Sequence, residues 1–313
     1  MPDPVSMQRR HMPLRHTILL LGGTGFIGSN LARELTNAGH DVLVGARTGD
    51  AAGNVHALPI EDSDAILAFV RKRGVEVVVH LVSRMKPGSP MADYVIERRQ
   101  VITPTIHLAE GLAEVGVKLV FISSGGTIYG VTTGAPVAED DRCAPISLYG
   151  QSKLEIETWL EFLGRTAGLD YLILRPSNPY GRNQPLRGGQ GLISVAMGKL
   201  LNDQALEVWG DGSSIRDYIY IDDLVLTIRQ LIEAGVSGMA LNIGSGEGHS
   251  LLEIVNTIRE VTGRTLGLVF RSARPVDVPK LVLDVRRVRG TGLHHARPLE
   301  DGIATYADEV LNG

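Results

Sequence analysis

The chain has 313 residues, enough for one large domain or two ordinary ones. Hydrophobic residues make up 43% and charged residues 21%, as in soluble globular proteins, and the net charge of −4 supplies no overall positive field for nucleic acid. The single cysteine, Cys143, excludes an intrachain disulfide and a multi-cysteine metal site, and it favours a reducing, cytoplasmic compartment. No apolar run near the start is long enough for a membrane span, so no membrane is expected as a partner. The net charge gives no reason to expect nucleic acid.

The first two-thirds of the chain alternate short apolar runs with amphipathic segments. Residues 1–16 show no periodicity and are predicted to form an irregular extension. Strands are then predicted at 17–21, 41–45, 75–81, 117–122 and 171–174, and helices at 26–38, 64–73, 91–115 and 147–167. Strands without polar alternation are buried on both faces, as in parallel sheets. The predicted fold is therefore α/β, a Rossmann-like doubly wound parallel sheet.

A change of rhythm after residue 175 predicts a second lobe. A loop at 176–191 precedes elements that are predicted at 192–201 (helix), 217–221 (strand), 224–234 (helix), 240–243 (strand), 251–262 (helix) and 301–311 (helix). We assign residues 17–176 plus 217–243 to a dinucleotide-binding domain. Residues 177–216 plus 244–313 are assigned to a smaller C-terminal lobe that binds substrate over the carboxyl ends of the strands.

A glycine-rich turn, GGTGFIG at 22–28, joins the first predicted strand to the first helix. Glycines there permit a tight turn and let backbone N–H groups approach a pyrophosphate, whose charge the helix N-terminus favours. Gly28 would let the helix lie close to the sheet. The flanking strand and helix supply the context that the motif alone lacks.

The end of the second strand carries Ala46-Arg47 where an NAD-binding domain commonly has an acidic residue. Arg47 is compatible with three roles: pairing with the 2′-phosphate of NADP, stacking on adenine, or exposure to solvent. The expected cofactor is NAD, with NADP left open.

Tyr149 and Lys153 lie four residues apart at the start of the helix predicted at 147–167. One helical turn places them on the same face, where an ammonium close to the phenol would lower the pKa of Tyr149 and make it a base.

With these two motifs in place, the sequence resembles the extended short-chain dehydrogenase/reductases, specifically the NAD-dependent epimerase/dehydratase family that acts on nucleotide sugars. The resemblance runs from residue 17 to the C-terminus. Its motifs are GGTGFIG (22–28), SSGGTIYG (123–130), YGQSK (149–153), LRPSNPYG (174–181), WGDGSSIRDYIYIDD (209–223) and LNIGSGEGHSLLEI (241–254).

The resemblance implies that Tyr149 is the acid/base on a sugar hydroxyl and that Lys153 tunes it while holding the nicotinamide ribose. The family's third catalytic hydroxyl falls on Gly125, so Ser124 is the expected substitute and Thr127 the reserve. The cofactor contacts that we expect are Gly22, Gly25, Phe26, Ile27, Gly28, Arg47, Leu81 and Ser83, together with Tyr149 and Lys153.

For the substrate, the resemblance implies that Asn178 and Arg216 bind the diphosphate and that Arg274 lies near the nucleotide. An arginine fork independently suits phosphate oxygens. Surface ion pairs remain an alternative for both arginines.

The implied reaction is 4-epimerisation of a nucleotide sugar, UDP-hexose in our expectation, by transient hydride transfer to bound NAD. The Asp-Glu pair of the family's dehydratases is absent at 125–127, which disfavours dehydration. An NADP-dependent 4-keto-nucleotide-sugar reductase and a catalytically silent cofactor-binding protein remain alternatives. The nine histidines lack metal-ligand spacing, so no metal is expected.

Members of this family commonly dimerise through two long helices, here 91–115 and 147–167, so we expect a homodimer. Apolar positions on these helices allow such packing, although burial against the sheet explains them equally well. They include Leu108, Leu112, Leu154 and Leu160.

Overall fold

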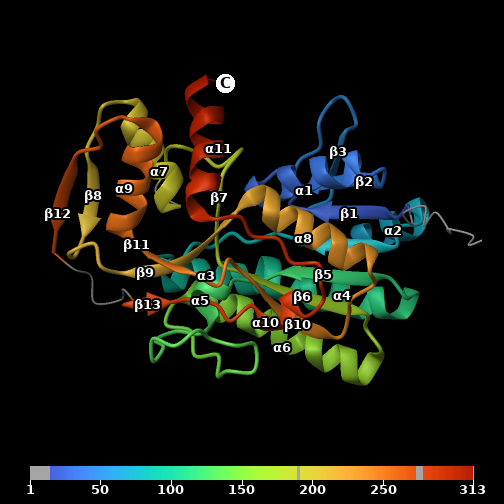
Figure 1. Ribbon diagram of the computed structural model, residues 1–313. Helices are drawn as coiled ribbons and strands as arrows, with labels where there is room; N and C mark the ends of the chain where they lie inside the picture. Colours follow the sequence, from blue (N-terminus) through green and yellow to red (C-terminus); the bar gives the residue numbers. More distant parts are fainter. Residues whose placement is uncertain (1–14, 189–190, 273–277, 313) are drawn as a thin grey trace, which may run out of the picture.

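The computed structural model describes residues 15–188, 191–272 and 278–312, so the predicted extension at 1–16 lies almost wholly outside the described residues. Seven strands form one parallel sheet in the order β10-β6-β5-β4-β1-β2-β3 (Figure 1). They are β1 (Thr17–Leu21), β2 (Asp41–Ala46), β3 (Val55–Ala57), β4 (Val77–His80), β5 (Lys118–Ile122), β6 (Tyr171–Pro176) and β10 (Met239–Ile243). The predicted Rossmann-like sheet is confirmed.

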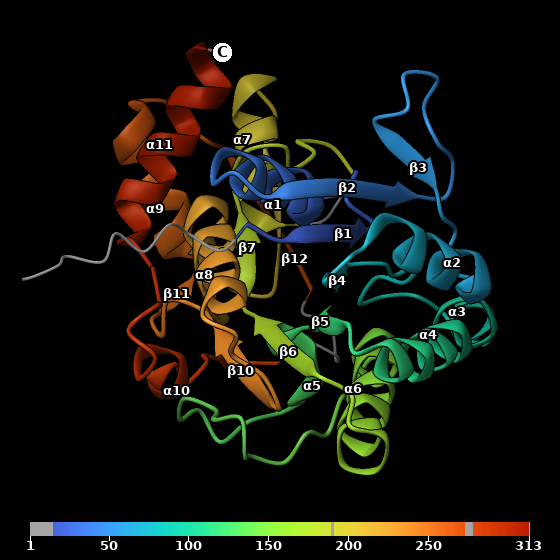
Figure 2. The same cartoon turned by 90° about the vertical axis from the view of Figure 1, so that its right-hand side faces the viewer.

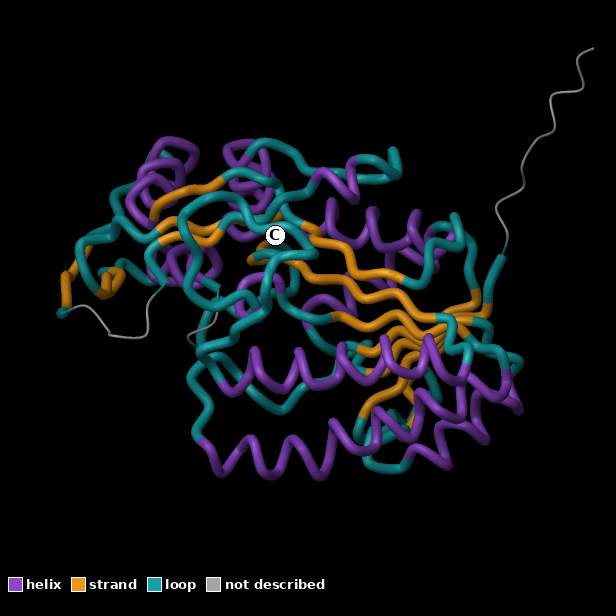
Figure 3. The backbone as a smooth tube through the Cα atoms, turned by 90° about the horizontal axis from the view of Figure 1, so that it is seen from below, coloured by secondary structure: helices purple, strands orange, loops and turns teal. Residues whose placement is uncertain are grey.

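Helices cover both faces of this sheet (Figures 2 and 3). On one face α1 (Phe26–Asn37) packs against α8 (Ile221–Glu233). On the other, α4 (Thr103–Val115) lies between α2 (Ser63–Arg73) and α6 (Leu148–Ala167). Each face has its own apolar core, which explains why the strands read as unbroken Val, Ile and Leu runs.

The long helix predicted at 91–115 is not one regular helix. It consists of α3 (Met91–Glu97), a π-helical turn η1 (Arg98–Ile102) and then α4. Such wide turns are rare in proteins, and many of those that do occur lie at functional sites.

The strand order reverses next to β1, because β2 and β3 extend the sheet on one side of β1 and β4, β5 and β6 extend it on the other. In doubly wound sheets the two chain connections diverge at this point and leave a crevice beyond the carboxyl ends of the strands. The turn after β1 and the segment after β4 are therefore expected to face a ligand.

The second lobe contains two small sheets. One joins β7 (Asn178–Tyr180), β9 (Ile215–Tyr220), β11 (Gly248–Ser250) and β13 (Lys280–Leu281), and the other pairs β8 (Leu206–Trp209) with β12 (Leu268–Arg271). Its helices are α7 (Leu192–Leu201), α9 (Leu251–Thr262) and α11 (Leu299–Asn312), while the short α5 (Gly125–Ile128) and α10 (Arg286–Arg289) lie beside the large sheet.

One predicted boundary differs from this arrangement. The prediction placed the strand that begins at residue 217 in the dinucleotide-binding domain, but β9 pairs with β7, β11 and β13. An apolar run shows that a strand is buried, not which sheet it joins. The buried carboxylate of Asp217 holds β9 there by accepting hydrogen bonds from the backbone of Ser245, Gly246 and Leu283.

Within the described part of the chain, no helix combines the length and the apolar character needed to cross a bilayer.

Candidate active site

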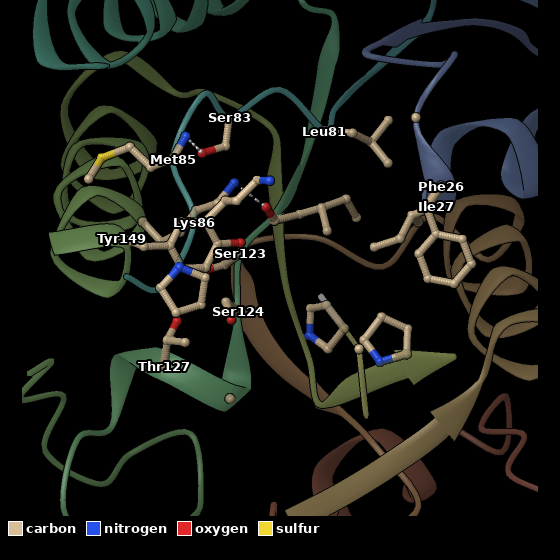
Figure 4. Close-up of a pocket in the computed structure, with 18 of the residues that line it drawn as sticks. Phe26, Ile27, Leu81, Ser83, Met85, Lys86, Ser123, Ser124, Thr127 and Tyr149 are labelled. Carbon is tan, nitrogen blue, oxygen red and sulfur yellow. Dashed lines mark hydrogen bonds between the residues drawn. The ribbon is translucent and has the colours of Figure 1, made fainter. Parts of the chain in front are cut away.

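A cavity of about 1080 Å³ opens beyond the carboxyl ends of the central strands. Its wall is built from the turn after β1, the ends of β4, β5 and β6, the first turn of α6 and the loop before α7. Figure 4 shows Tyr149, Ser123, Ser124 and Thr127 on one side and Phe26, Ile27 and Leu81 on the other. This is the location that the reversal of strand order predicts.

The glycine turn forms one wall of the cavity through Gly22, Gly25, Phe26, Ile27 and Gly28. Gly25 is the extended N-cap residue of α1, so the first N–H groups of that twelve-residue helix have no partner within the helix. A Cβ atom on Gly28 would lie 2.4 Å from the carbonyl oxygen of Gly22 and 2.7 Å from Cα of Gly23. Only glycine lets α1 start this close to the turn, and the resulting backbone cradle fits a dinucleotide pyrophosphate.

Replacing Gly28 with alanine is expected to push α1 away from the turn. The new methyl group would meet backbone rather than a movable side chain, so we expect a loss of about 1–3 kcal/mol in the free energy of unfolding together with weaker dinucleotide binding. Gly25→Ala is the matched control, because its Cβ would lie 3.4 Å from the nearest atom, the oxygen of Gly22, and its φ of −76° suits any residue. Urea titration of both variants measures the difference, and equal stabilities would contradict this packing argument.

Tyr149, Lys153 and Ser124 meet on the opposite wall. The side chain of Ser147 caps α6 by accepting a hydrogen bond from the N–H of Gly150, which fixes Tyr149 in the first turn of the helix. The ammonium of Lys153 donates to the carbonyl of Ile122 at 3.0 Å and lies 5.9 Å from the centre of the Tyr149 ring. The hydroxyl of Ser124 lies close enough to the phenol to act on its pKa.

The acidity of this pair differs from the simplest expectation. Burial raises the pKa of Tyr149 to about 12, the nearby hydroxyl of Ser124 opposes that rise, and the charge of Glu97 adds to it. Burial lowers the pKa of Lys153 to about 8, and Glu97 and Glu157 oppose this fall. In the protein alone, burial outweighs any effect of the lysine on the phenol, because Lys153 points toward Ile122 and over the Phe121 ring at 4.8 Å.

The absence of a hydroxyl at residue 125 has a packing cause. A Cβ atom on Gly125 would lie 2.7 Å from Cδ1 of Leu283 and 2.8 Å from the carbonyl oxygen of Arg175. Ser124 lines the cavity beside the phenol, and its catalytic role stays a prediction. Thr127 and Ser123 also line the cavity, and their buried hydroxyls have no hydrogen-bond partner among the described residues, so both can serve a ligand.

Of the residues expected to bind substrate and adenosine, only some lie at the cavity. Asn178 lines the cavity, and its amide donates to the carbonyl of Asp217 at 2.7 Å. Arg216 donates to the carbonyl of Ile215 and is not part of the cavity wall, and the exposed Arg47 is not part of it either. Arg274 lies outside the described residues. The remaining expected cofactor contacts, Leu81 and Ser83, line the cavity at the end of β4.

Sequence reasoning did not identify two parts of this site. The loop from Met85 to Pro90 forms a wall of the cavity. Glu97 is 1% exposed and acts electrostatically on both Tyr149 and Lys153. The sequence does carry a signal for Glu97, because it lies three residues after Tyr94 and four before the buried Val101, on the same face of the helix. A carboxylate on a buried helix face needs a hydrogen-bond or ion-pair partner, which marks the residue for attention.

The described residues contain no group of three or more His, Cys, Asp or Glu side chains that could hold a metal ion.

Comparison with known proteins fits the geometry. Residues 18–244 match the sequence profile of the NAD dependent epimerase/dehydratase family. The chain belongs to this family. The match covers more than half of the chain and includes the glycine turn, the Tyr149–Lys153 pair and Asn178.

Three relatives show how the family uses this fold. The structure of UDP-glucose 4-epimerase from Thermotoga maritima with UDP-glucose has a TM-score of 0.87 and 30% identity, covering 94% of this chain and 98% of that one. UDP-glucose 4-epimerase from Thermus thermophilus in complex with NAD has a TM-score of 0.86 and 26% identity, covering 95% and 99%. dTDP-4-dehydro-6-deoxyglucose reductase of Escherichia coli is 30% identical over 304 residues, covering 92% and 96%.

Proposed function

We propose that this protein interconverts the C4 epimers of a nucleotide sugar, with UDP-hexose as the substrate class and NAD as a retained cofactor. The observation that carries the proposal is the convergence of Tyr149, Lys153 and Ser124 on a cavity that the glycine turn and Asn178 also line. UDP-glucose 4-epimerases among the relatives, and NAD in one of their structures, support the substrate and cofactor.

The chain's residues divide the work in this proposal. NAD, when bound, supplies a hydride acceptor for C4 and a positive charge that favours the phenolate. Tyr149 takes the proton of the C4 hydroxyl and later returns it. Ser124 donates to the same oxygen, while Lys153 holds the nicotinamide ribose and stabilises the ionised phenol. The backbone at Gly22–Gly28 holds the cofactor pyrophosphate, and Asn178 holds the substrate diphosphate.

Burial strengthens this arrangement. Tyr149 and Lys153 are removed from water, so a charge introduced beside them acts through a medium of low effective dielectric constant. The burial that makes the phenol a weak acid in the protein alone therefore makes its pKa sensitive to a bound cation.

The decisive assay is incubation of the purified protein with UDP-glucose or UDP-galactose and, in parallel, with a 4-keto nucleotide sugar, each with and without added NADPH. We expect conversion to the C4 epimer without added nucleotide, and NAD in the supernatant after denaturation. Conversion only of a 4-keto sugar and only with NADPH would establish the second candidate, a reductase, which Ala46-Arg47 and the similarity to the Escherichia coli reductase favour. No turnover and no bound nucleotide would indicate a silent protein of the same fold.

We also propose that two copies pair through α3 and α6. Leu108, Leu112 and Leu160 are fully buried against the sheet and cannot form such an interface. The exposed apolar side chains of this region are instead Met91, Val95 and Ile96 on α3, and Trp159 and Phe162 on α6. The rings of Trp159 and Phe162 pack edge to face, with 5.6 Å between the ring centres. Exposed clusters of this kind commonly mark an interface. The cytoplasmic location stays a prediction from the single cysteine.

Trp159→Glu is expected to convert the proposed dimer to a monomer, because a carboxylate would be buried without a partner at the interface. Phe270→Glu is the control, since Phe270 is an even more exposed aromatic residue (54% against 39% for Trp159) on β12, far from α6 in the fold. Sedimentation velocity should give the monomer mass for the first variant and the dimer mass for the second. A wild-type protein that sediments as a monomer at micromolar concentration would contradict this proposal.

A further inference from the structure

The carboxylate of Glu97 is a buried charge that the proposed reaction does not use. It is 1% exposed, it ends α3, and the π-helical turn η1 follows it directly. A buried carboxylate is costly unless it is hydrogen-bonded and faces opposite charge, so its partners show what it does.

Both oxygens of Glu97 hold the segment that follows β4. Oε1 accepts a hydrogen bond from the hydroxyl of Ser83 at 2.9 Å, and Oε2 accepts one from the backbone N–H of Arg84 at 3.0 Å. The same Ser83 hydroxyl accepts from the N–H of Met85 at 3.2 Å, as the dashed line in Figure 4 shows. Because Ser83 and Met85 line the cavity, Glu97 fixes the position of this wall from behind.

Glu97 also acts electrostatically on the ammonium of Lys153. Lys153 is 3% exposed, it donates a hydrogen bond to the neutral carbonyl of Ile122, and within the described ranges no carboxylate lies close enough to form an ion pair with it. Glu97 exerts the largest charge effect on Lys153, ahead of Glu157, whose carboxylate already pairs with Arg175. The other titratable groups that act on Lys153 or line the same cavity are His80, Lys86, Asp93 and Tyr149.

A nearby carboxylate provides a contrast. Glu155 on α6 accepts hydrogen bonds from the phenol of Tyr94 at 2.7 Å and from Arg98 at 3.1 Å, so it joins α3 to α6. It is absent from the charges that shift the pKa of Tyr149 or Lys153. Both residues are glutamates near the contact between α3 and α6. Only Glu97 is hydrogen-bonded to the segment that lines the cavity.

We propose that Glu97 is a positioning residue of this site: its two carboxylate oxygens fix the Ser83–Met85 wall, and from there it acts on the ammonium of Lys153. The inference deepens the proposed function and rests on it for its catalytic meaning, but its structural content can be measured without turnover.

The test is the titration of Lys153 in protein labelled with carbon-13 at the lysine Cε atoms, followed by NMR. The chain has few lysines, and Lys153→Arg identifies the signal. The wild-type midpoint is expected near pH 8. Glu97→Gln keeps the side-chain shape and removes the charge, so the midpoint should fall by roughly half a unit or more. Glu155→Gln and Ser83→Ala should move it by less than ~0.2 units, because the first carboxylate acts elsewhere and the second change leaves the Glu97 side chain in place.

The activity readout follows the same sign. If protonated Lys153 is needed, Glu97→Gln should move the alkaline limb of kcat/KM to lower pH, whereas Ser83→Ala should raise KM without moving that limb. A folded Glu97→Gln protein whose Lys153 titrates at the wild-type midpoint would overturn the inference. A shifted midpoint in a protein that converts no nucleotide sugar would instead uphold the role of Glu97 and overturn the proposed function.

Discussion

Tyr149→Phe is expected to lower kcat for epimerisation by about 10²–10⁴-fold while leaving the fold intact. Phenylalanine keeps the ring that packs in the first turn of α6 and removes only the hydroxyl near Ser124. The variant would therefore lack the proposed acid/base group while keeping the rest of the cavity wall. KM should change little, because the phenol acts mainly in the transition state.

Tyr171→Phe is the matched control for this prediction. Tyr171 begins β6, its side chain is half-buried, and it lies outside the cavity wall. Loss of its hydroxyl should leave kcat within about twofold of wild type. If Tyr149→Phe retained a tenth or more of wild-type kcat, the acid/base role would belong to another group.

Arg175→Leu is expected to lower the free energy of unfolding by about 3–5 kcal/mol. The guanidinium of Arg175 is buried and binds both oxygens of Glu157, with the shortest contact at 2.6 Å. It also donates to the hydroxyl of Tyr129 and to the carbonyl of Glu139. Leucine would leave the Glu157 carboxylate, which is 1% exposed, without its counter-charge on the helix that carries Tyr149.

Two comparisons make this stability prediction specific. Arg271→Leu breaks an ion pair with Glu207 in which both side chains are about half exposed, so it should cost less than about 1 kcal/mol. The double variant Arg175→Leu with Glu157→Leu should be more stable than Arg175→Leu alone, because no unpaired buried charge remains. Chemical denaturation gives all three values, and a cost near that of Arg271→Leu would show that the buried pair is not needed.

The sequence predicted the parts of this protein that depend on short segments. The glycine turn at 22–28 and the pair Tyr149 and Lys153 each lie within a few consecutive residues, so spacing predicts that their members lie close together. It did not predict that Lys153 bonds the carbonyl of Ile122. Unbroken apolar strands likewise indicated a sheet covered on both faces, which the structure confirms.

The parts that escaped prediction depend on contacts between distant segments. A side chain at residue 125 would collide with Leu283, which lies more than 150 residues further along the chain. Glu97 matters because α3 packs behind the segment that follows β4, and β9 joins the second sheet through partners on both sides of it in sequence. A one-dimensional pattern records which residues are buried but not which neighbours bury them.

The central claim is that the hydrogen at C4 leaves the sugar and returns to it within one cavity. UDP-glucose carrying deuterium at C4, incubated in ordinary water with the purified protein and no added nucleotide, tests this directly by NMR and mass spectrometry. The account predicts UDP-galactose that keeps its deuterium at C4. Deuterium lost to water, or no product without added NADPH, would contradict it.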